Sequence, residues 1–427
     1  MKQLSSSGKK ILLLLSIALI LRILFVFFLH PPEDYLYSDM KRYYNGAVKI
    51  AHSQPEDLFD SFHPPGTQYL YALFFRLPHS FFWIKVFNVL ISTSSCYLIF
   101  LSTKLLFNEK AAWIAFAITS LNYLFIDFTG YLLSTTPFIF CLTLMFYSLI
   151  KSIKSEYQNQ RRLYSFLTGL FVTVSISFNP TFLLFVPFFG LWWLFNFKKY
   201  HLASNVPFYF LGFLPLYFLL CFRVYLLTGQ LGTIASNGGL NFYVGRAHVF
   251  FVHLHDVERN RKFDFASPVA TQKNYAYSPH FKKGPYDSAF FFKEGLKEIR
   301  KDIPRTVSYS LEYLNNLFCS TVIWPSAAQK GFSGVIKYFN IAFVFTIIVP
   351  AIALFFVRFK SITGSLQLLA CLPIFVIIAT AITFHAEPRY RVPYDVFFII
   401  LAGYFYSTVN WLKIKESLYG LYRSIRK

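Results

Sequence analysis

The sequence predicts an all-α polytopic membrane protein with about ten transmembrane helices. Of its 427 residues, 55% are hydrophobic and only 14% are charged, which is too few polar side chains to cover a water-soluble fold of this size. The apolar residues gather in runs of about 20, the length at which a helix crosses a hydrocarbon core of roughly 30 Å. Most of the chain must therefore face lipid.

Ten windows meet or approach this length, and Asn179-Pro180 forms a predicted turn between two short ones. The first window follows Lys9 and Lys10 and looks like a signal peptide, but it is longer than a usual signal core and lacks a small-residue cleavage site, so we interpret it as an uncleaved span. The span count between 163 and 197 stays open by one or two. The predicted spans are 9–29, 80–106, 111–128, 131–150, 163–180, 182–197, 206–228, 336–357, 366–384 and 393–412.

Short basic clusters occupy alternate connections between these spans. By the positive-inside rule, these connections and both termini are predicted to be cytoplasmic. The net charge of +21 is explained by topology and anionic lipid headgroups, so we predict no nucleic-acid partner. The clusters are Lys104 and Lys110; Lys151, Lys154, Arg161 and Arg162; Lys198 and Lys199; Arg358 and Lys360; and the tail from Lys413 to Lys427.

The remaining connections face outward and divide the chain into three parts. Residues 1–228 form an N-terminal membrane module whose outer loop, 30–79, carries an acidic site. Residues 229–335 form a long outer loop with short helices, predicted at Ser288 to Lys301, ended by Pro304, and from Val307 to about Val322. Residues 336–427 hold the last three spans, a short outer turn and a basic tail.

Loop 30–79 contains two amphipathic runs that we expect to lie as helices along the membrane surface. The first follows an acidic and aromatic stretch and continues to about Ala51, with Asp39 and Tyr43 on one face. The second runs from Tyr69 to Leu77, after His63-Pro64-Pro65-Gly66 breaks the chain.

Cysteines and histidines give no clear metal or disulfide framework. Four of the five cysteines, Cys96, Cys141, Cys221 and Cys371, lie inside apolar runs. His253, His255 and Asp256 have a spacing that suits a metal, but no further ligand is visible nearby and a solvated loop is favoured. No cofactor is assigned, and a divalent metal is left open.

Several short motifs, taken in order, resemble one family: the bacterial relatives of protein O-mannosyltransferases and aminoarabinose transferases, glycosyltransferase family 39 of the GT-C membrane type. Each motif is weak alone, and the ordered set is fairly specific. The motifs are Ser38-Asp39 with Tyr43-Tyr44, Pro64-Pro65-Gly66, Lys85-Val86-Phe87-Asn88, Leu106 to Ala112, Ser236 to Phe242 with Gly245, and Glu387-Pro388-Arg389-Tyr390-Arg391-Val392-Pro393.

The resemblance implies transfer of a sugar from a polyprenyl-phosphate carrier to a lipid, glycan or protein acceptor on the outer face. The donor sugar and the acceptor vary among relatives and do not carry over. The chain departs from the pattern at Thr135, where many relatives have a glutamate, which weakens the case for a second acidic site residue from that span.

Asp39 is the candidate catalytic base. It would accept the proton of the acceptor as the acceptor oxygen attacks the anomeric carbon from the opposite side and inverts it. Sequence physics alone allows an alternative of equal weight, in which Ser38 and Asp39 only cap the following helix. The matching acidic position in the family favours catalysis.

Four basic residues are candidates for binding the donor phosphate. Arg389 and Arg391 stand in a short outer turn, where the positive-inside rule disfavours arginine, although pairing with Glu387 or snorkelling to headgroups would also explain them. Lys85 and Arg223 lie near the outer ends of spans two and seven, where phosphate binding and snorkelling are equally plausible.

The candidate substrate-binding residues come from the same outer segments. Asp127 could instead form a hydrogen bond to a neighbouring span. The segment at Asn237 has a composition that permits tight turns, and a plain turn without substrate contact is the alternative there. The set comprises Tyr43, Asp127, Asn237, Asn241, Glu387 and Tyr390.

Two other functions compete with the enzyme. A transporter or flippase of a lipid-linked glycan would use the same charges along a path, but it should place ionisable groups at the midplane and show internal repeats. The charges predicted here lie at outer span ends, and no repeat is found. A non-enzymatic scaffold would not require the loop charges to converge.

Overall fold

The computed structural model describes residues 6–200, 203–232, 234–246, 286–319, 333–357 and 366–409, together with residues 323 and 325. Every regular element in these ranges is a helix, which confirms the predicted all-α fold class. Six helices are long and apolar enough to cross a membrane, and a bent pair adds a seventh if its halves form one span. The six are Ser6–Leu29, Ser80–Leu106, Thr135–Lys154, Val206–Thr228, Gly334–Val357 and Leu366–Thr383.

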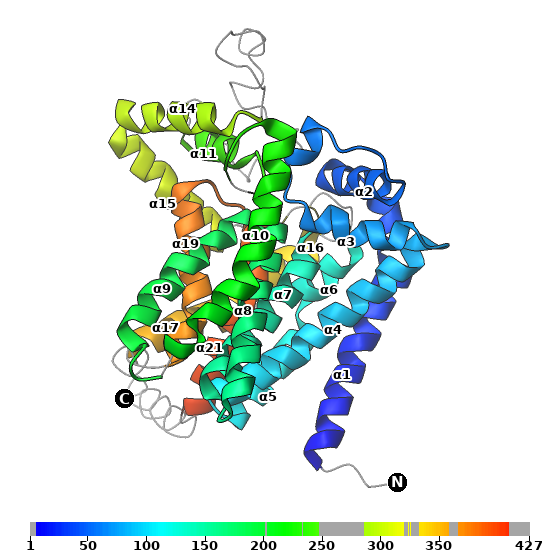
Figure 1. Cartoon of the computed structure of the whole chain (residues 1–427). Helices are drawn as coiled ribbons and strands as arrows, with labels where there is room; N and C mark the ends of the chain where they lie inside the picture. The colour runs from blue at the N-terminus through cyan, green and yellow to red at the C-terminus, as the bar shows by residue number, and fades with distance from the viewer. Residues whose placement is uncertain are drawn as a thin grey trace, which may run out of the picture.

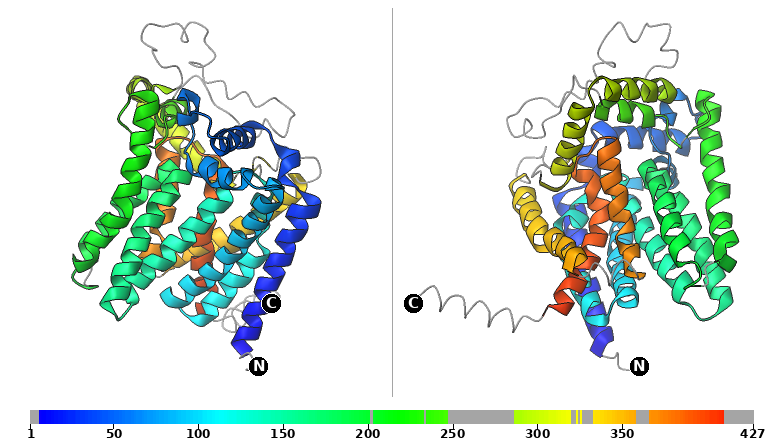
Figure 2. Two further views of the ribbon diagram at one scale, coloured as in Figure 1. Left: turned by 45° about the vertical axis from the view of Figure 1, so that its right-hand side comes forward. Right: turned by 90° about the vertical axis from the view of Figure 1, so that its left-hand side faces the viewer.

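The helices form an upright bundle whose two ends differ (Figure 1). The start of α1 (Ser6–Leu24) and the end of α21 (Asp395–Thr408) lie at one end. The opposite end carries α2 (Ser38–Ala51), α3 (Gly66–Phe75), α11 (Gly238–Arg246) and α14 (Ser288–Lys301), and we call it the loop end. Two further views show the same arrangement (Figure 2).

The centre of the bundle is built from the spans of both halves of the chain. α4 (Ser80–Leu106) packs on α5 (Glu109–Leu121) and α7 (Thr135–Lys154), and α5 packs on α21. α7 continues the packing to α8 (Gln158–Phe178), and α8 to α10 (Val206–Thr228). α9 (Phe185–Asn196), α16 (Ser333–Phe343), α17 (Val349–Val357) and α19 (Leu372–Thr383) surround them.

Both outer loops form the predicted helices, with some shifts of their boundaries. The first surface run is α2 and ends at Ala51 as predicted, the second is α3 and begins at Gly66 instead of Tyr69, and Ser288 to Lys301 is helix α14 as predicted. The prediction that the next helix starts at Val307 was wrong, because α15 runs from Ile303 to Cys319. The Asp302 carboxylate accepts the Arg305 N–H at 2.9 Å, so Asp302 caps this helix, and Pro304 lies in its first turn, where proline is favoured.

A buried arginine in the first span stabilises a break in a neighbouring span. The bent pair joins α5 to α6 (Tyr123–Asp127) and 3-10 turn Phe128–Gly130 at an angle of 52°. Arg22, fully buried, donates to the carbonyl oxygens of Ser120 at 3.2 Å and Thr119 at 3.3 Å, and to Ser92 Oγ at 2.7 Å. Since a helix break frees backbone carbonyls that lipid cannot satisfy, this buried guanidinium has a structural role.

Two glycines allow α8 and α10 to cross at close range. A Cβ added to Gly169 would lie 2.0 Å from the Tyr209 carbonyl oxygen, and one added to Gly212 would lie 2.1 Å from the Phe166 carbonyl oxygen. Backbone atoms cannot move aside as a flexible side chain can. The crossing is therefore of the small-residue type that packs membrane helices.

We predict that Gly212→Val separates α8 from α10 and lowers the thermal unfolding temperature in detergent, with a cost of at least about 1–3 kcal/mol as for other overpacked cores. Gly190→Ala is the matched control, because nothing lies within 4 Å of its added Cβ. Equal unfolding temperatures for both variants would contradict the close crossing.

Candidate functional site

An ion pair joins loop 30–79 to the turn that precedes the last helix. Arg389 Nη1 donates to Asp39 Oδ2 at 3.2 Å, and Arg389 Nε lies 3.9 Å from Glu387 Oε2. The Arg389 side chain is 15% exposed and that of Asp39 is 27% exposed, so the pair is partly shielded and still reachable. The structure thus brings Asp39, Arg389 and Glu387 together from segments about 350 positions apart.

Asp39 does not cap its helix. Residue Tyr37 occupies the cap position of α2 with no side-chain cap hydrogen bond, and the Asp39 carboxylate points to Arg389 instead. Ser38, directly before it, has a φ of 48°, in the left-handed region that non-glycine residues rarely adopt. Such local strain is kept where surrounding contacts hold it and is frequent at functional sites.

The two carboxylates around Arg389 differ in their proton affinity. Burial disfavours the charged form of Asp39, but the charges of Arg389 and Arg42 outweigh it and hold the pKa of Asp39 below its usual value. Burial raises the pKa of Glu387, and the Asp39 charge adds to this while Arg389 opposes it. Neighbouring groups with pKa values pushed apart are typical of acid–base sites.

Two histidines beside the pair are neutral at pH 7. Burial lowers the pKa of His63 to about 4, and its Nε2 accepts a hydrogen bond from Arg42 Nη1 at 3.0 Å. Burial likewise lowers the pKa of His385 to about 4, and its Nε2 lies 3.2 Å from Tyr390 Oη. Both rings therefore act as neutral hydrogen-bonding groups, and neither was singled out by the sequence.

Tyr43 and Tyr390 pack against the pair. Tyr43 is buried on α2, hydrogen bonds to Ser134 just before α7, and has its ring 5.5 Å from that of His63. Tyr390 lies under Arg389, whose guanidinium carbon is 5.4 Å from the ring centroid. The expected neighbourhood of Asp39, Tyr43, Glu387, Arg389 and Tyr390 is thus present in one place.

Arg391 faces the opposite way and is fully buried. Its Nε donates to Asp395 at 2.9 Å, its Nη2 to Asn340 at 2.7 Å and its Nη1 to the Leu317 carbonyl at 3.1 Å. These contacts join α15, α16 and α21. Its side chain is 0% exposed, so the structure places Arg391 inside the packed helices, and its role as a phosphate ligand stays a prediction.

Lys85 and Arg223 are paired with local carboxylates. Lys85 Nζ lies 2.5 Å from Glu33 Oε1, and Arg223 Nη2 lies 2.5 Å from Glu56 Oε1. Arg223 also donates to the Asp60 carbonyl at 3.1 Å, which ties α10 to loop 30–79. Both residues therefore fasten the loop to the bundle in this structure, and neither contact involves the Asp39–Arg389 pair.

The remaining predicted residues lie at the end of α6 and at the start of α11. Asp127 is fully buried at the end of α6, and Asn88 Nδ2 donates to the nearby Thr129 carbonyl at 3.3 Å. Asn237 precedes α11 and its carbonyl accepts the Asn241 N–H at 2.9 Å, so this segment begins a helix. A Cβ at Gly245 would lie 1.6 Å from the Phe384 carbonyl oxygen, so this glycine permits α11 to reach the segment before His385.

No group of three metal-binding side chains is found among the residues that the structure describes. The candidate ligands His253, His255 and Asp256 lie outside the described residues.

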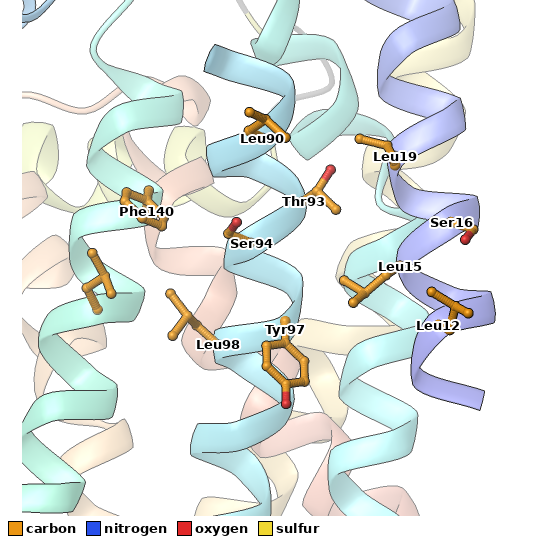
Figure 3. A pocket seen from close by; sticks show the side chains of 11 residues that line it. Leu12, Leu15, Ser16, Leu19, Leu90, Thr93, Ser94, Tyr97, Leu98 and Phe140 are labelled. Atoms are coloured by element: carbon orange, nitrogen blue, oxygen red, sulfur yellow. The ribbon is translucent and has the colours of Figure 1, made fainter. Parts of the chain in front are cut away.

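A groove of about 520 Å³ opens on the side of the bundle between α1, α4 and α7 (Figure 3). It lies at the level of the middle of these spans and contains none of the predicted site residues. Such a groove can take a hydrocarbon chain but offers no acid, base or charge. It is lined by Leu12, Leu15, Ser16, Leu19, Leu90, Thr93, Ser94, Tyr97, Leu98, Phe140 and Leu144.

Comparison with known proteins agrees with this architecture. Residues 62–225, less than half of the chain, match the family model described as dolichyl-phosphate-mannose-protein mannosyltransferase. No curated protein matches the chain in sequence. Residues 62–225 are thus similar to this mannosyltransferase family, and the apolar helices of the chain are those of an integral membrane protein.

Solved structures show the same fold. An oligosaccharyltransferase of Archaeoglobus fulgidus in complex with zinc and sulfate has a TM-score of 0.55 at 11% identity, over 97% of this chain and 51% of that one. The archaeal oligosaccharyltransferase AglB from this organism, in complex with an inhibitory peptide and a dolichol-phosphate, has a TM-score of 0.51 at 13% identity, over 99% and 52%. The chain thus spans about half the length of these proteins and has their GT-C membrane fold.

ArnT from Cupriavidus metallidurans, bound to undecaprenyl phosphate, also matches. Its TM-score is 0.41 at 12% identity, over 94% of this chain and 78% of that one.

We predict that Arg391→Met lowers the free energy of unfolding by about 3–5 kcal/mol, because it leaves the Asp395 charge buried without its partner. The double variant Arg391→Met/Asp395→Asn removes both charges and should recover part of the loss. Thermal unfolding in detergent measures both, with Arg389→Met as the partly exposed comparison. An Arg391→Met protein as stable as wild type would show that the buried pair is not structural.

Proposed function

We propose that this chain is an inverting glycosyltransferase that moves a sugar from a polyprenyl-phosphate donor to a lipid, glycan or protein acceptor. The observation that carries the proposal is the Asp39–Arg389 pair at 3.2 Å, with Glu387 beside it, at the loop end of a GT-C fold. The match of residues 62–225 to the mannosyltransferase family supports glycosyl transfer as the reaction class.

The site offers the two groups that such a transfer needs. The Asp39 carboxylate, ionised because its pKa is lowered, takes the proton of the acceptor hydroxyl while the hydroxyl oxygen bonds to the anomeric carbon. The bond from that carbon to the phosphate oxygen breaks, and its electron pair leaves with the polyprenyl phosphate. Arg389 neutralises the phosphate charge, since a guanidinium presents five donors that suit phosphate oxygens.

We assign the remaining roles to the other members of the cluster. Glu387, whose pKa is raised, supplies a second carboxyl from the last turn, in a chain that has Thr135 where many relatives have a glutamate. Tyr43 and Tyr390 shape the substrate site on either side of the pair. Asn237, Asn241 and Asp127 lie further out and stay candidates for contacts with the sugar or acceptor.

The topology and the three-part division belong to the same proposal. The first helix begins and the last described helix ends on the side opposite the site (Figure 2), which supports cytoplasmic termini and a site on the outer face of a bacterial inner membrane. Residues 1–228 and 336–427 supply the two halves of the ion pair. Residues 229–335 add helices that pack beside it.

The buried arginine in the first span does not support the alternative that this chain is a transporter. Arg22 is the charged residue fully buried within the first span, and it is bonded to Ala18, Thr119, Ser120, Ser92 and Cys96. A guanidinium held by backbone carbonyls and side chains of three helices fixes the helices, whereas a transport path needs groups that a substrate can reach.

Asp39→Asn tests the proposed base. The substitution keeps size and removes the proton acceptor, so the variant should fold and bind the lipid carrier but lose about 10²- to 10⁴-fold in transfer rate. Turnover of a polyprenyl-phosphate sugar by purified, reconstituted protein is the measurement, and the unfolding temperature controls for the fold. Near wild-type turnover would remove Asp39 from the mechanism.

Arg389→Gln tests the electrostatic coupling of the pair. Because Arg389 lowers the pKa of Asp39 against the effect of burial, its removal should raise that pKa and move the acid limb of the kcat/KM profile to higher pH. Arg389→Lys keeps the charge and should move the limb less, while losing the bidentate fork for phosphate. The measurement is kcat/KM as a function of pH for wild type and both variants. An acid limb at the same pH in Arg389→Gln as in wild type would contradict the coupling.

A further inference from the structure

Helix α15 has an apolar edge that the described part of the chain leaves open. Ile303, Val307 and Leu311 follow one another at four-residue spacing and are 61%, 52% and 62% exposed. Side chains four apart lie on the same side of a helix, so the three form a continuous line, which we call the α15 edge. A neighbouring side of α15 packs on α19 and α20 (Pro388–Arg391).

The lower part of this edge is level with the end of a membrane span. Ser310 Oγ donates to the carbonyl of Ile382 at 3.1 Å, and Ile382 lies in the last turn of α19, within the apolar span Leu366–Thr383. Ile382 is itself 43% exposed. Leu311, next to Ser310, therefore lies where the hydrocarbon core meets the interface at the loop end.

The edge spans the depth of an interfacial layer. From Leu311 to Ile303 the helix rises by about 12 Å. The headgroup layer on one side of a bilayer is roughly 5–7 Å thick beyond the hydrocarbon. α15 runs obliquely up from the bundle to α14 (Figure 2), which shortens its rise along the membrane normal. Leu311 therefore reaches the acyl chains, Val307 lies just above them, and Ile303 lies among the headgroups.

Basic side chains surround the upper end of the edge. Arg300, Lys301 and Arg305, which we call the basic corner, are all exposed where α14 meets α15. Lys301 is 65% exposed while its partner Glu298 is only 12% exposed, so the outward charge is positive. Arg305 Nε donates to Tyr309 Oη at 3.0 Å and lies over its ring, and tyrosine is favoured at membrane interfaces.

We propose that the α15 edge inserts into the membrane leaflet on the side of the candidate site, and that the basic corner binds anionic lipid headgroups. Apolar side chains at acyl-chain depth beneath arginine and lysine at headgroup level are the arrangement of an interfacial anchor. The edge also continues the lipid-facing surface of α19 through Ile382.

Lipid contact here would support the site through α15. The Leu317 carbonyl of α15 accepts a hydrogen bond from Arg391, two residues from Arg389. Arg246 Nη1 donates to Ser310 of the same helix at 2.8 Å, and it also donates to the Phe384 carbonyl, just before His385. A lipid-anchored α15 thus holds the segment on both sides of the turn that carries Arg389.

The depth of the edge can be measured with nitroxide labels on the full chain in nanodiscs. Val307→Cys and Lys293→Cys are labelled after the native cysteines are replaced by alanine. Lys293 is the control, because it is exposed on α14 opposite the face that packs on α11 through Gly295 and Phe242. The label at 307 should collide with oxygen more than with a water-soluble nickel complex, and the label at 293 should do the reverse.

Two results would overturn the insertion. Collision of the nickel complex with the label at 307 as often as at 293 would place the edge in water. Low collision with both reagents at 307 would mean that protein covers the edge, either a second copy of this chain or another subunit.

Headgroup binding is tested with phosphatidylcholine nanodiscs with and without phosphatidylglycerol. Wild type should unfold at a higher temperature when the anionic lipid is present, and Arg300→Gln/Arg305→Gln should lose most of this rise. The control Lys293→Gln/Lys297→Gln removes the same amount of charge from α14, and its unfolding temperature should still rise with phosphatidylglycerol. A wild type that does not respond to phosphatidylglycerol, or an equal loss in both double variants, would refute the basic corner.

Discussion

The arrangement of the loop end depends on the pairing of charges at the edge of lipid. Three cations at the loop end are bonded to a group from a distant segment: Arg389 to Asp39, Arg223 to Glu56 and Lys85 to Glu33. An unpaired charge in these partly desolvated positions is costly, so every pair acts as a link between segments. Together they hold loop 30–79 over the ends of α4 and α10 and against the last turn.

One of these three pairs differs from the other two and forms the candidate site. Lys85–Glu33 and Arg223–Glu56 each join one cation to one carboxylate. Arg389 lies between two carboxylates of unequal proton affinity, next to a strained backbone at Ser38 and two neutral histidines. The two structural ion pairs and the candidate site are made of the same residue types. They differ in how deeply the groups are buried and in which charged groups lie beside them.

Arg389 and Arg391 illustrate how strongly position determines role. They are two residues apart in a short helix, and residues at this spacing lie on nearly opposite sides of a helix. Arg389 faces the loop end and is partly exposed, while Arg391 is enclosed by Asp395, Asn340 and the Leu317 carbonyl. The sequence pattern treated them as equivalent phosphate ligands, because a turn motif carries no information on which side is covered.

The sequence by itself determined the class of fold and the place of the acid. Apolar runs of about 20 residues require membrane helices, since a helix satisfies its own backbone in lipid and the strands of a barrel are shorter, and amphipathic periodicity indicated α2 and α3. Asp39 was identified from its position at the start of such a helix and from the family motif. Local signals were enough for these features, because they depend on neighbours along the chain.

The tertiary structure alone decided the partners. Glu56 and Glu33 were not predicted as the partners of Arg223 and Lys85, His63 and His385 carried no signal as neighbours of Asp39, and Arg22 was not predicted to hold the break between α5 and α6. The bonds of Lys85, Arg22 and Arg223 in this set join residues between 52 and 167 positions apart. Which charges meet is set by how the helices pack, and one sequence without its packing does not specify that.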